Sequence, residues 1–216
     1  MSRTKGLNSV IRHPHDEYIT PPWCVKRLLE KYELPRSGLL FDPCASRGEL
    51  LSTVHTLRPD LLLYGVEINP NCHSALVSAA GAFERAWIGD FLKMQSPEIP
   101  SATTILTNPP YSLAEQFILQ ALLFAKRVIM LLRVNFLAGK DRREFTARTN
   151  PGVFVLPNRP SFNGWGSDGT EYGWFVYGDP AVAGRWQVLD LTPIEEIAEW
   201  NGKMRIRYPK PVEAAA

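Results

Sequence analysis

Residues 103–111 read TTILTNPPY, an apolar, β-branched run followed directly by Asn-Pro-Pro-Tyr. The run over residues 103–107 predicts a buried strand. The two prolines predict its end, because proline has no N–H to donate to a neighbouring strand. Residues 112–125 then have the spacing of an amphipathic helix, and Ser112 with Glu115 predicts a capping box at its start. The stretch therefore predicts a strand, a rigid turn and a helix in succession.

The same alternation of strands and helices continues on both sides of this stretch. We expect further strands at residues 39–42, 61–68, 86–90 and 127–134, and further helices at residues 20–31, 48–57 and 71–81. Residues 152–156 and 172–177 predict an antiparallel pair, and residues 186–191 allow one more edge strand. The predicted fold class is α/β and Rossmann-like, with a mostly parallel seven-stranded sheet, an antiparallel C-terminal strand and helices on both faces.

Length and composition predict one domain over residues 1–216. The chain is 45% hydrophobic and 21% charged, which excludes disorder and coiled coils. Cys24, Cys44 and Cys72 are odd in number and lack a CxxC spacing, which indicates a reducing compartment. No apolar run is long enough for a bilayer and no signal peptide is apparent, so we expect a cytoplasmic protein with no membrane partner. The four histidines lack the spacing of a metal site, so we expect no metal.

Basic residues gather in three stretches, although the formal net charge is only +2. Residues 1–15 carry three basic and no acidic residues, residues 126–159 carry eight and two, and residues 201–216 carry four and one. Clustered Lys and Arg are what a phosphate-facing side needs. The alternative is a set of solvated faces and tails. The clustering of basic residues is therefore compatible with a nucleic-acid partner but does not require one.

Asn-Pro-Pro-Tyr at residues 108–111 is the strongest functional signal. A planar amino group attacks a methyl group only as its nitrogen becomes more tetrahedral. The Asn108 side-chain oxygen and the Pro109 carbonyl can each accept one of its N–H bonds, and Pro110 helps to fix the backbone. Tyr111 offers a flat face on which a base can stack. The alternative is an ordinary X-Pro-Pro turn that ends a strand.

Acidic residues follow three other predicted strands. The turn DPCASRG, residues 42–48, is small enough for a nucleoside to lie against its backbone, and Asp42 could hold an ammonium group. Glu67 lies where a ribose diol would bind. Asp90 could bind an adenine amino group, and Phe91 could lie on its face. Each residue alone could be a cap or a solvated loop residue, but four consecutive strand ends favour a site for a nucleoside cofactor.

Residues 18–177 resemble the S-adenosylmethionine-dependent methyltransferases that modify the N6 amino group of adenine in DNA. The resemblance implies the class I methyltransferase fold and S-adenosylmethionine as the cofactor. It implies a catalytic tetrapeptide of Asn108, Pro109, Pro110 and Tyr111. It implies cofactor contacts at Asp42, Pro43, Ala45, Gly48, Glu67, Ile68, Asp90 and Phe91, with Tyr18 and Thr20 in a segment that closes over the methionine end. Compact phage and prophage members look most similar, because they share an ending like RPSF at residues 159–162 and TEYGWFV at residues 170–176.

The resemblance also divides the chain. Residues 1–35 would form the cofactor-closing segment, residues 36–180 the catalytic core, residues 135–170 the target-contacting loops and residues 181–216 a C-terminal extension. Ser46 stands where the family usually has glycine, which would alter the approach of the cofactor. The residues after the last core strand are too few for a separate recognition domain. We therefore expect the loops to read a short or degenerate target.

Aromatic and basic residues in those loops are candidates for contacts with the target. Phe136 and Phe162 could each supply the second face of a base sandwich, and Trp165 could stack at the position that a flipped base leaves. Arg142 and Arg143 could neutralise phosphates. The alternatives are ordinary packing for the phenylalanines and a solvated helix face for the arginines.

These observations predict a methyltransferase that acts on N6 of a flipped adenine in single- or double-stranded DNA. The tetrapeptide suits any planar NH2, so adenine in RNA and the glutamine amide of a protein stay open as acceptors. Cytosine N4 is also open, although Ser-Pro-Pro-Tyr is commoner in that group. A different class is a catalytically silent nucleic-acid-binding subunit on the same fold. Cofactor binding with or without turnover would separate this last class from the enzymes.

Overall fold

The computed structural model describes residues 18–79, 85–95, 102–167 and 169–209. Its strands are β1 (Leu39–Asp42), β2 (Leu62–Glu67), β3 (Arg85–Ile88), β4 (Ala102–Thr107), β5 (Ala125–Arg133), β6 (Gly152–Val155), β7 (Tyr172–Tyr177) and β8 (Trp186–Val188). Its α-helices are α1 (Pro22–Leu29), α2 (Glu49–Leu57), α3 (His73–Ala79), α4 (Ala114–Phe124), α5 (Arg143–Thr149) and α6 (Ile194–Arg207). Among these described residues, no helix is both long and apolar enough to cross a membrane.

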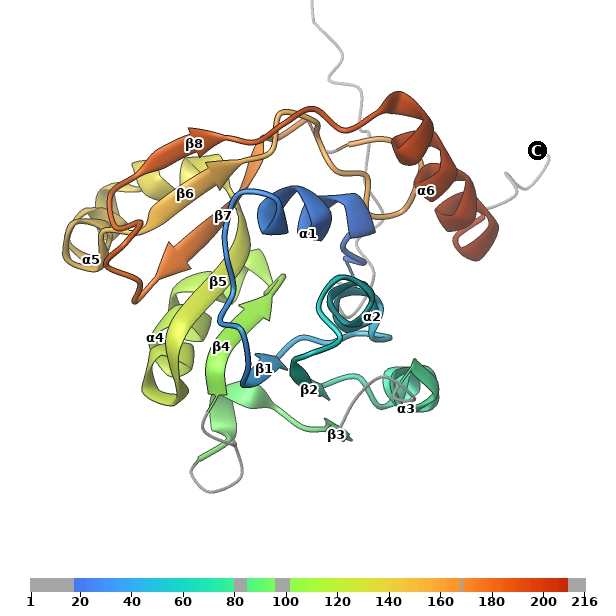
Figure 1. Cartoon of the computed structure of the whole chain (residues 1–216), viewed down its shortest axis with the longest axis horizontal. Helices are drawn as coiled ribbons and strands as arrows, with labels where there is room; N and C mark the ends of the chain where they lie inside the picture. The colour runs from blue at the N-terminus through green and yellow to red at the C-terminus, as the bar shows by residue number, and fades with distance from the viewer. Residues whose placement is uncertain (1–17, 80–84, 96–101, 168, 210–216) are drawn as a thin grey trace, which may run out of the picture.

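All eight strands belong to one sheet, in the order β3-β2-β1-β4-β5-β7-β6-β8 (Figure 1). Strands β1 to β5 pair in parallel, and β7 is antiparallel to both of its neighbours, β5 and β6. The predicted fold class is confirmed. The sheet has eight strands where seven were predicted, because residues 186–188 form the further edge strand that the sequence allowed.

Both faces of the sheet are buried, as β5 shows. Its residues Val128, Met130 and Leu132 pack in one apolar cluster with α4 and α5, whereas Ile129 and Leu131 pack in another with α1, α2 and α6. Figure 1 shows α4 and α5 on one side of the sheet and α1 and α2 on the other. A continuous apolar strand is what a sheet covered on both faces requires.

The turn after β1 crosses β2 at short range, at Gly65. The backbone N–H of Ala45 donates to the carbonyl of Val66 at 2.9 Å. A methyl group on Gly65 would lie 2.8 Å from Leu51 Cδ1 and 2.9 Å from Ala45 Cβ, which is closer than carbon atoms approach in a packed interior. Glycine at position 65 therefore lets the turn lie directly against β2.

This turn contains two residues with left-handed backbone. Ser46 has φ 47° and Gly48 has φ 90°. Glycine adopts this conformation readily, whereas serine does so rarely. The Ser46 N–H donates to the Glu67 carboxylate at 2.8 Å, and this bond helps to hold the conformation. Ser46 thus completes a left-handed turn at the position where the resemblance leads us to expect glycine.

The start of α4 differs from the prediction. Residues Tyr111–Leu113 form a 3-10 turn, η4, in which the Leu113 N–H donates to the Pro110 carbonyl at 2.9 Å. The helix therefore begins at Ala114, and Leu113 ahead of it makes no side-chain cap. The predicted capping box of Ser112 and Glu115 is wrong, because the turn that follows Pro110 already includes Ser112.

Trp174 anchors the N-terminal helix to the sheet. Its indole is fully buried on β7, and Nε1 donates to the Cys24 carbonyl of α1 at 2.9 Å. A buried indole N–H needs such an acceptor, so the bond fixes where α1 crosses the sheet. Tyr18, which lies just ahead of α1, is thereby held near the sheet edge.

We expect Gly65→Ala to lower the free energy of unfolding by about 1–3 kcal/mol, because the added methyl group overlaps Leu51 and Ala45. Gly202→Ala in α6 is the matched control, since nothing lies within 4 Å of its added methyl group. Alanine favours a helix over glycine by about 0.5–1 kcal/mol, so the control should gain stability. Urea titration of both variants measures the two effects, and a stable Gly65→Ala variant would contradict the close approach.

Candidate functional site

The carboxyl ends of β1, β2, β3 and β4 meet around a hollow of about 180 Å³. Parallel strands bring their carboxyl ends to one edge of the sheet, where ligands of such folds bind. We call this hollow the acidic cavity, because its lining, among the described residues, includes the carboxyl groups of Glu67 and Asp90 and no basic side chain. Eight residues predicted from the sequence line it: Tyr18, Pro43, Glu67, Ile68, Asp90, Phe91, Asn108 and Pro110.

Glu67 is held on both carboxylate oxygens by the backbone. Oε2 accepts the N–H of Ser46 at 2.8 Å, and Oε1 accepts the N–H of Asn69 at 2.8 Å. Each carboxylate oxygen can accept more than one hydrogen bond, and the side chain is only half-buried. Glu67 is therefore a rigid acceptor pair that can still receive two hydroxyl groups.

Asp90 caps the 3-10 turn η3 (Phe91–Lys93). Its Oδ1 accepts the N–H of Leu92 at 3.1 Å, and its Oδ2 lies 3.1 Å from the ammonium of Lys93. Phe91 is buried, and its ring packs against Phe41 and Phe117. Capping was the alternative explanation for an acid at this strand end, and here the same residue both caps the turn and lines the acidic cavity.

Asp42 ends β1 in a buried position, with 1% of its surface exposed. The N–H of Cys44 donates to its Oδ1 at 3.0 Å. Burial raises the pKa of Asp42 to about 7, and the neighbouring charge of Glu67 adds to the rise. Four predicted cofactor contacts lie off the lining of the acidic cavity: Asp42, Thr20, Ala45 and Gly48. The hydrogen bond from Cys44 ties Asp42 to the turn after β1.

The side-chain amide of Asn108 is bonded at both ends by tyrosines. Its Nδ2 donates to the Tyr18 carbonyl at 3.1 Å, and its Oδ1 accepts the Tyr111 hydroxyl at 2.9 Å. The first bond fixes which way the amide points. Asn108 Oδ1 is thus aimed at Tyr111, away from the N-terminal segment that holds Nδ2.

A second hollow of about 340 Å³ lies on the other side of Tyr111. We call it the basic cleft, because the part of its lining that the structure describes includes Arg133 and Arg142 and no carboxylate side chain. The other lining residues are Tyr18, Tyr111, Ser112, Leu132, Asn135 and Phe136. Tyr18 lines both hollows. Two hollows of opposite charge therefore adjoin at Tyr18 and the Asn108–Tyr111 pair.

Four aromatic rings form a closed circuit beside the basic cleft. Tyr111 lies 5.8 Å from Tyr18 and 5.5 Å from Tyr172, measured between ring centroids. Phe162 completes the circuit at 5.4 Å from both Tyr18 and Tyr172. Tyr172 and Phe162 are buried, whereas Tyr18 and Tyr111 are half-exposed and form the open side.

The structure brings Phe136 and Arg142 to the cleft but leaves other predicted target contacts elsewhere. The guanidinium of Arg142 lies 4.6 Å from the ring centre of the buried Phe136. Trp165 lies against the end of α6, where its Nε1 donates to the Tyr208 carbonyl at 2.6 Å and Arg205 covers its ring. Arg143 is exposed at the start of α5 and is not on the lining of the cleft.

Sequence reasoning missed Arg133 and Tyr172. The two residues are paired directly in the antiparallel register of β5 and β7. A signal was present, because Arg133 lies near the end of one predicted strand and Tyr172 begins another. Only the pairing of those two strands brings both residues to Tyr111.

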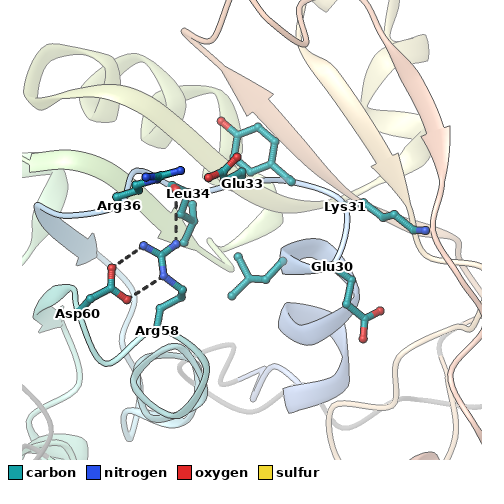
Figure 2. Close-up of a pocket in the computed structure, with 9 residues that line it drawn as sticks. Glu30, Lys31, Glu33, Leu34, Arg36, Arg58 and Asp60 are labelled. Carbon is teal, nitrogen blue, oxygen red and sulfur yellow. Dashed lines mark hydrogen bonds and ion pairs between the residues drawn. The ribbon is translucent and has the colours of Figure 1, made fainter.

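A third hollow, of about 540 Å³, lies at the opposite edge of the sheet (Figure 2). It is lined by the segment between α1 and β1 and by Arg58 and Asp60. Figure 2 shows Arg58 bound to Asp60. The Arg58 Nε and Nη2 atoms lie 2.8 and 2.6 Å from the two carboxylate oxygens. The same guanidinium donates to the Leu34 and Pro35 carbonyls. The Arg58 N–H groups are thus used in hydrogen bonds within the protein. None of the site residues predicted from the sequence lines this hollow.

Comparison with known proteins finds similarity in structure alone. No model of a known protein family matches the chain, and no curated protein does. Among solved structures, the methyltransferase subunit of a type I restriction-modification system from Streptococcus thermophilus has a TM-score of 0.63 at 14% identity, covering 88% of this chain and 53% of its own. The chain thus spans about half the length of that subunit.

Two further structures are similar over most of this chain. A candidate RNA methyltransferase from Pyrococcus horikoshii has a TM-score of 0.59 at 17% identity, covering 76% of this chain and 87% of its own. A candidate class I S-adenosylmethionine-dependent methyltransferase from Listeria monocytogenes has a TM-score of 0.57 at 13% identity, covering 83% and 68%. The chain therefore has the Rossmann-like fold of the class I methyltransferases.

As the pH rises, we expect the free energy of unfolding of Asp42→Asn to increase relative to that of the unchanged protein. The pKa of Asp42 is about 7 in the fold and about 3.9 in an unfolded chain, so the stability that the protonated carboxyl contributes is complete below about pH 4 and is lost by about pH 7. The difference between the two proteins should change by about 1–4 kcal/mol over that range, measured by urea titration. Asp60→Asn is the control, because Arg58 lowers the pKa of that carboxyl. A pH-independent difference for Asp42→Asn would contradict the prediction.

Proposed function

We propose that the protein transfers a methyl group from S-adenosylmethionine to the N6 amino group of adenine in DNA. The observation that carries the proposal is the meeting of two hollows of opposite charge at Asn108. The acidic cavity suits a cofactor with ammonium and sulfonium charges, whereas the basic cleft suits a polyanion. Asn108 lines the acidic cavity, and its hydrogen-bond partner Tyr111 lines the basic cleft.

The residues of the acidic cavity fit the groups of S-adenosylmethionine. Glu67 would accept the ribose hydroxyls, and Asp90 with Phe91 would hold the adenine. When bound, the cofactor supplies a methyl group on a positively charged sulfur, an electrophile that needs no acid catalyst. The hollow of about 180 Å³ is smaller than the roughly 300 Å³ of a typical ligand pocket. We propose that its lining opens by a shift of the Tyr18 side chain, while the Tyr18 carbonyl keeps its hydrogen bond to Asn108.

Asn108 would hold the amino group that is methylated. The Tyr18 carbonyl fixes Nδ2, and Oδ1 accepts a hydrogen bond from Tyr111. An amino group that enters from the cleft would replace the Tyr111 hydroxyl as the donor to Oδ1, and the Pro109 carbonyl would accept its second N–H. Both bonds favour a nitrogen whose lone pair is no longer delocalised into the ring. Placing that lone pair is the main contribution of these residues, and the proton released on transfer passes to solvent.

The basic cleft would receive the flipped base and the strand that carries it. Phe136 and Arg142 lie on its lining, and the ring of Tyr111 faces the same space. DNA is proposed as the acceptor because of the resemblance over residues 18–177, and a restriction-modification subunit is among the structural neighbours. The archaeal neighbour, a candidate RNA methyltransferase, keeps adenine in RNA as the second candidate.

The proposal is tested by incubating the protein with labelled S-adenosylmethionine and, in parallel, duplex DNA, single-stranded DNA, RNA and a protein extract. Mass analysis of the hydrolysed products identifies the methylated group. N6-methyladenine in DNA is the expected product. Label in RNA or in glutamine would overturn the acceptor and leave the cofactor, whereas bound cofactor with no label in any arm would support the silent-subunit alternative.

We expect Asn108→Ala to lower the rate of methyl transfer by about 100-fold or more while the cofactor affinity stays within a few-fold, because the amide acts on the acceptor. Tyr111→Phe is the matched variant. It removes only the hydroxyl that now bonds to Asn108 Oδ1 and keeps the ring for stacking, so turnover should persist. Single-turnover kinetics and calorimetric titration measure the two effects. Loss of cofactor binding in Asn108→Ala, or equal inactivation of both variants, would contradict these roles.

A further inference from the structure

Arg133 ends β5 at the boundary between the aromatic circuit and the basic cleft. Its guanidinium carbon lies 5.2 Å from the ring centre of Tyr111. Its Nε donates to the Tyr172 hydroxyl at 3.3 Å. Because Tyr172 is fully buried on β7, this bond ties the arginine to the rigid sheet. The guanidinium is therefore held over the Tyr111 ring, beside which the acceptor base would enter.

The cleft contains a second pair of the same kind. Arg142 lies over Phe136, and both residues line the cleft with Arg133. An arginine that lies over an aromatic ring can still bind a phosphate, since its donors lie in the plane of the guanidinium group. Two guanidinium groups, each over an aromatic ring on one cleft lining, would form a path for a phosphate backbone, with the aromatic circuit at one end. Backbone contacts of this kind position a strand without reading its sequence.

We propose that Arg133 binds the phosphodiester next to the target nucleotide while its guanidinium lies over Tyr111. This inference rests on the proposed function and names the chemistry by which the site selects a nucleic-acid strand. The phosphate group and the stacked base would be held by two neighbouring residues, so the strand would be positioned where the base leaves it. DNA and RNA offer the same phosphodiester, so the inference covers both and excludes a protein amide as the acceptor.

The charge and the planar shape of the Arg133 side chain would contribute separately to phosphate binding, and two substitutions distinguish these contributions. Arg133→Gln removes the positive charge. Arg133→Lys keeps the charge but loses the planar guanidinium group and its paired N–H donors. Lys126→Gln is the matched control. Lys126 is an exposed cation at the amino end of β5, whereas Arg133 lies at the carboxyl end of the same strand.

Fluorescence anisotropy with a labelled, adenine-containing single-stranded DNA and its RNA equivalent gives the dissociation constants over a range of salt concentrations. We expect Arg133→Gln to weaken binding by about tenfold and to make the slope of log K against log salt shallower by about 0.7, the value for one phosphate contact on a single strand. Arg133→Lys should weaken binding and retain the slope. Lys126→Gln should match the unchanged protein in both.

The outcomes separate this inference from the proposed function. An unchanged affinity and salt slope in Arg133→Gln, in a protein that still methylates DNA, overturns the role of Arg133 alone. A protein that neither binds nor methylates either nucleic acid overturns both. Circular dichroism and cofactor titration of the variants show whether the fold and the acidic cavity are intact. If Arg133→Gln weakened the binding of RNA but left the binding of DNA unchanged, the inference would be overturned for a DNA acceptor.

Discussion

The amide of Asn108 is bonded at both ends, and the arrangement of the site depends on these two bonds. Tyr18 fixes its nitrogen from the N-terminal segment, and Tyr111 bonds to its oxygen from the turn that follows β4. The prolines between Asn108 and Tyr111 leave this turn little freedom. Trp174 holds α1, and with it the approach of Tyr18, against the sheet. The Asn108 side chain thus joins the end of a buried strand to Tyr18 and lies at the boundary between the two hollows.

Opposite charge in the two hollows has a simple physical consequence. Carboxyl groups on one lining and guanidinium groups on the other attract different ligands, and each group of charges would repel the partner of the other. A cationic cofactor and an anionic acceptor would therefore approach Asn108 from different sides. Asp42 lies behind the lining of the acidic cavity, and burial raises its pKa to about 7, so its carboxyl carries only part of a negative charge near neutral pH.

The fold and the acidic cavity could be predicted from the sequence because both follow from local patterns. Apolar strands such as residues 103–107 end at turn residues, and parallel strands carry their carboxyl ends to one edge, so Glu67, Asp90 and Asn108 meet there. The start of α4 was mispredicted, since Pro110 begins a 3-10 turn that overrides the signal of Ser112 and Glu115. Arg133 and Tyr172 could not be placed without the register of β5 and β7. Trp165 lies against α6 because of a tertiary contact that no local pattern shows.

A crystal structure of the protein with S-adenosylhomocysteine is the most direct test of the central claim that the acidic cavity is the cofactor site. We expect the ribose hydroxyls to lie within hydrogen-bond distance of the Glu67 carboxylate and the adenine to lie beside Asp90 and Phe91. We also expect the sulfur to face Asn108 and the Tyr18 side chain to have shifted to admit the ligand. A ligand seated instead in the hollow beside Arg58, or in the basic cleft, would contradict the account.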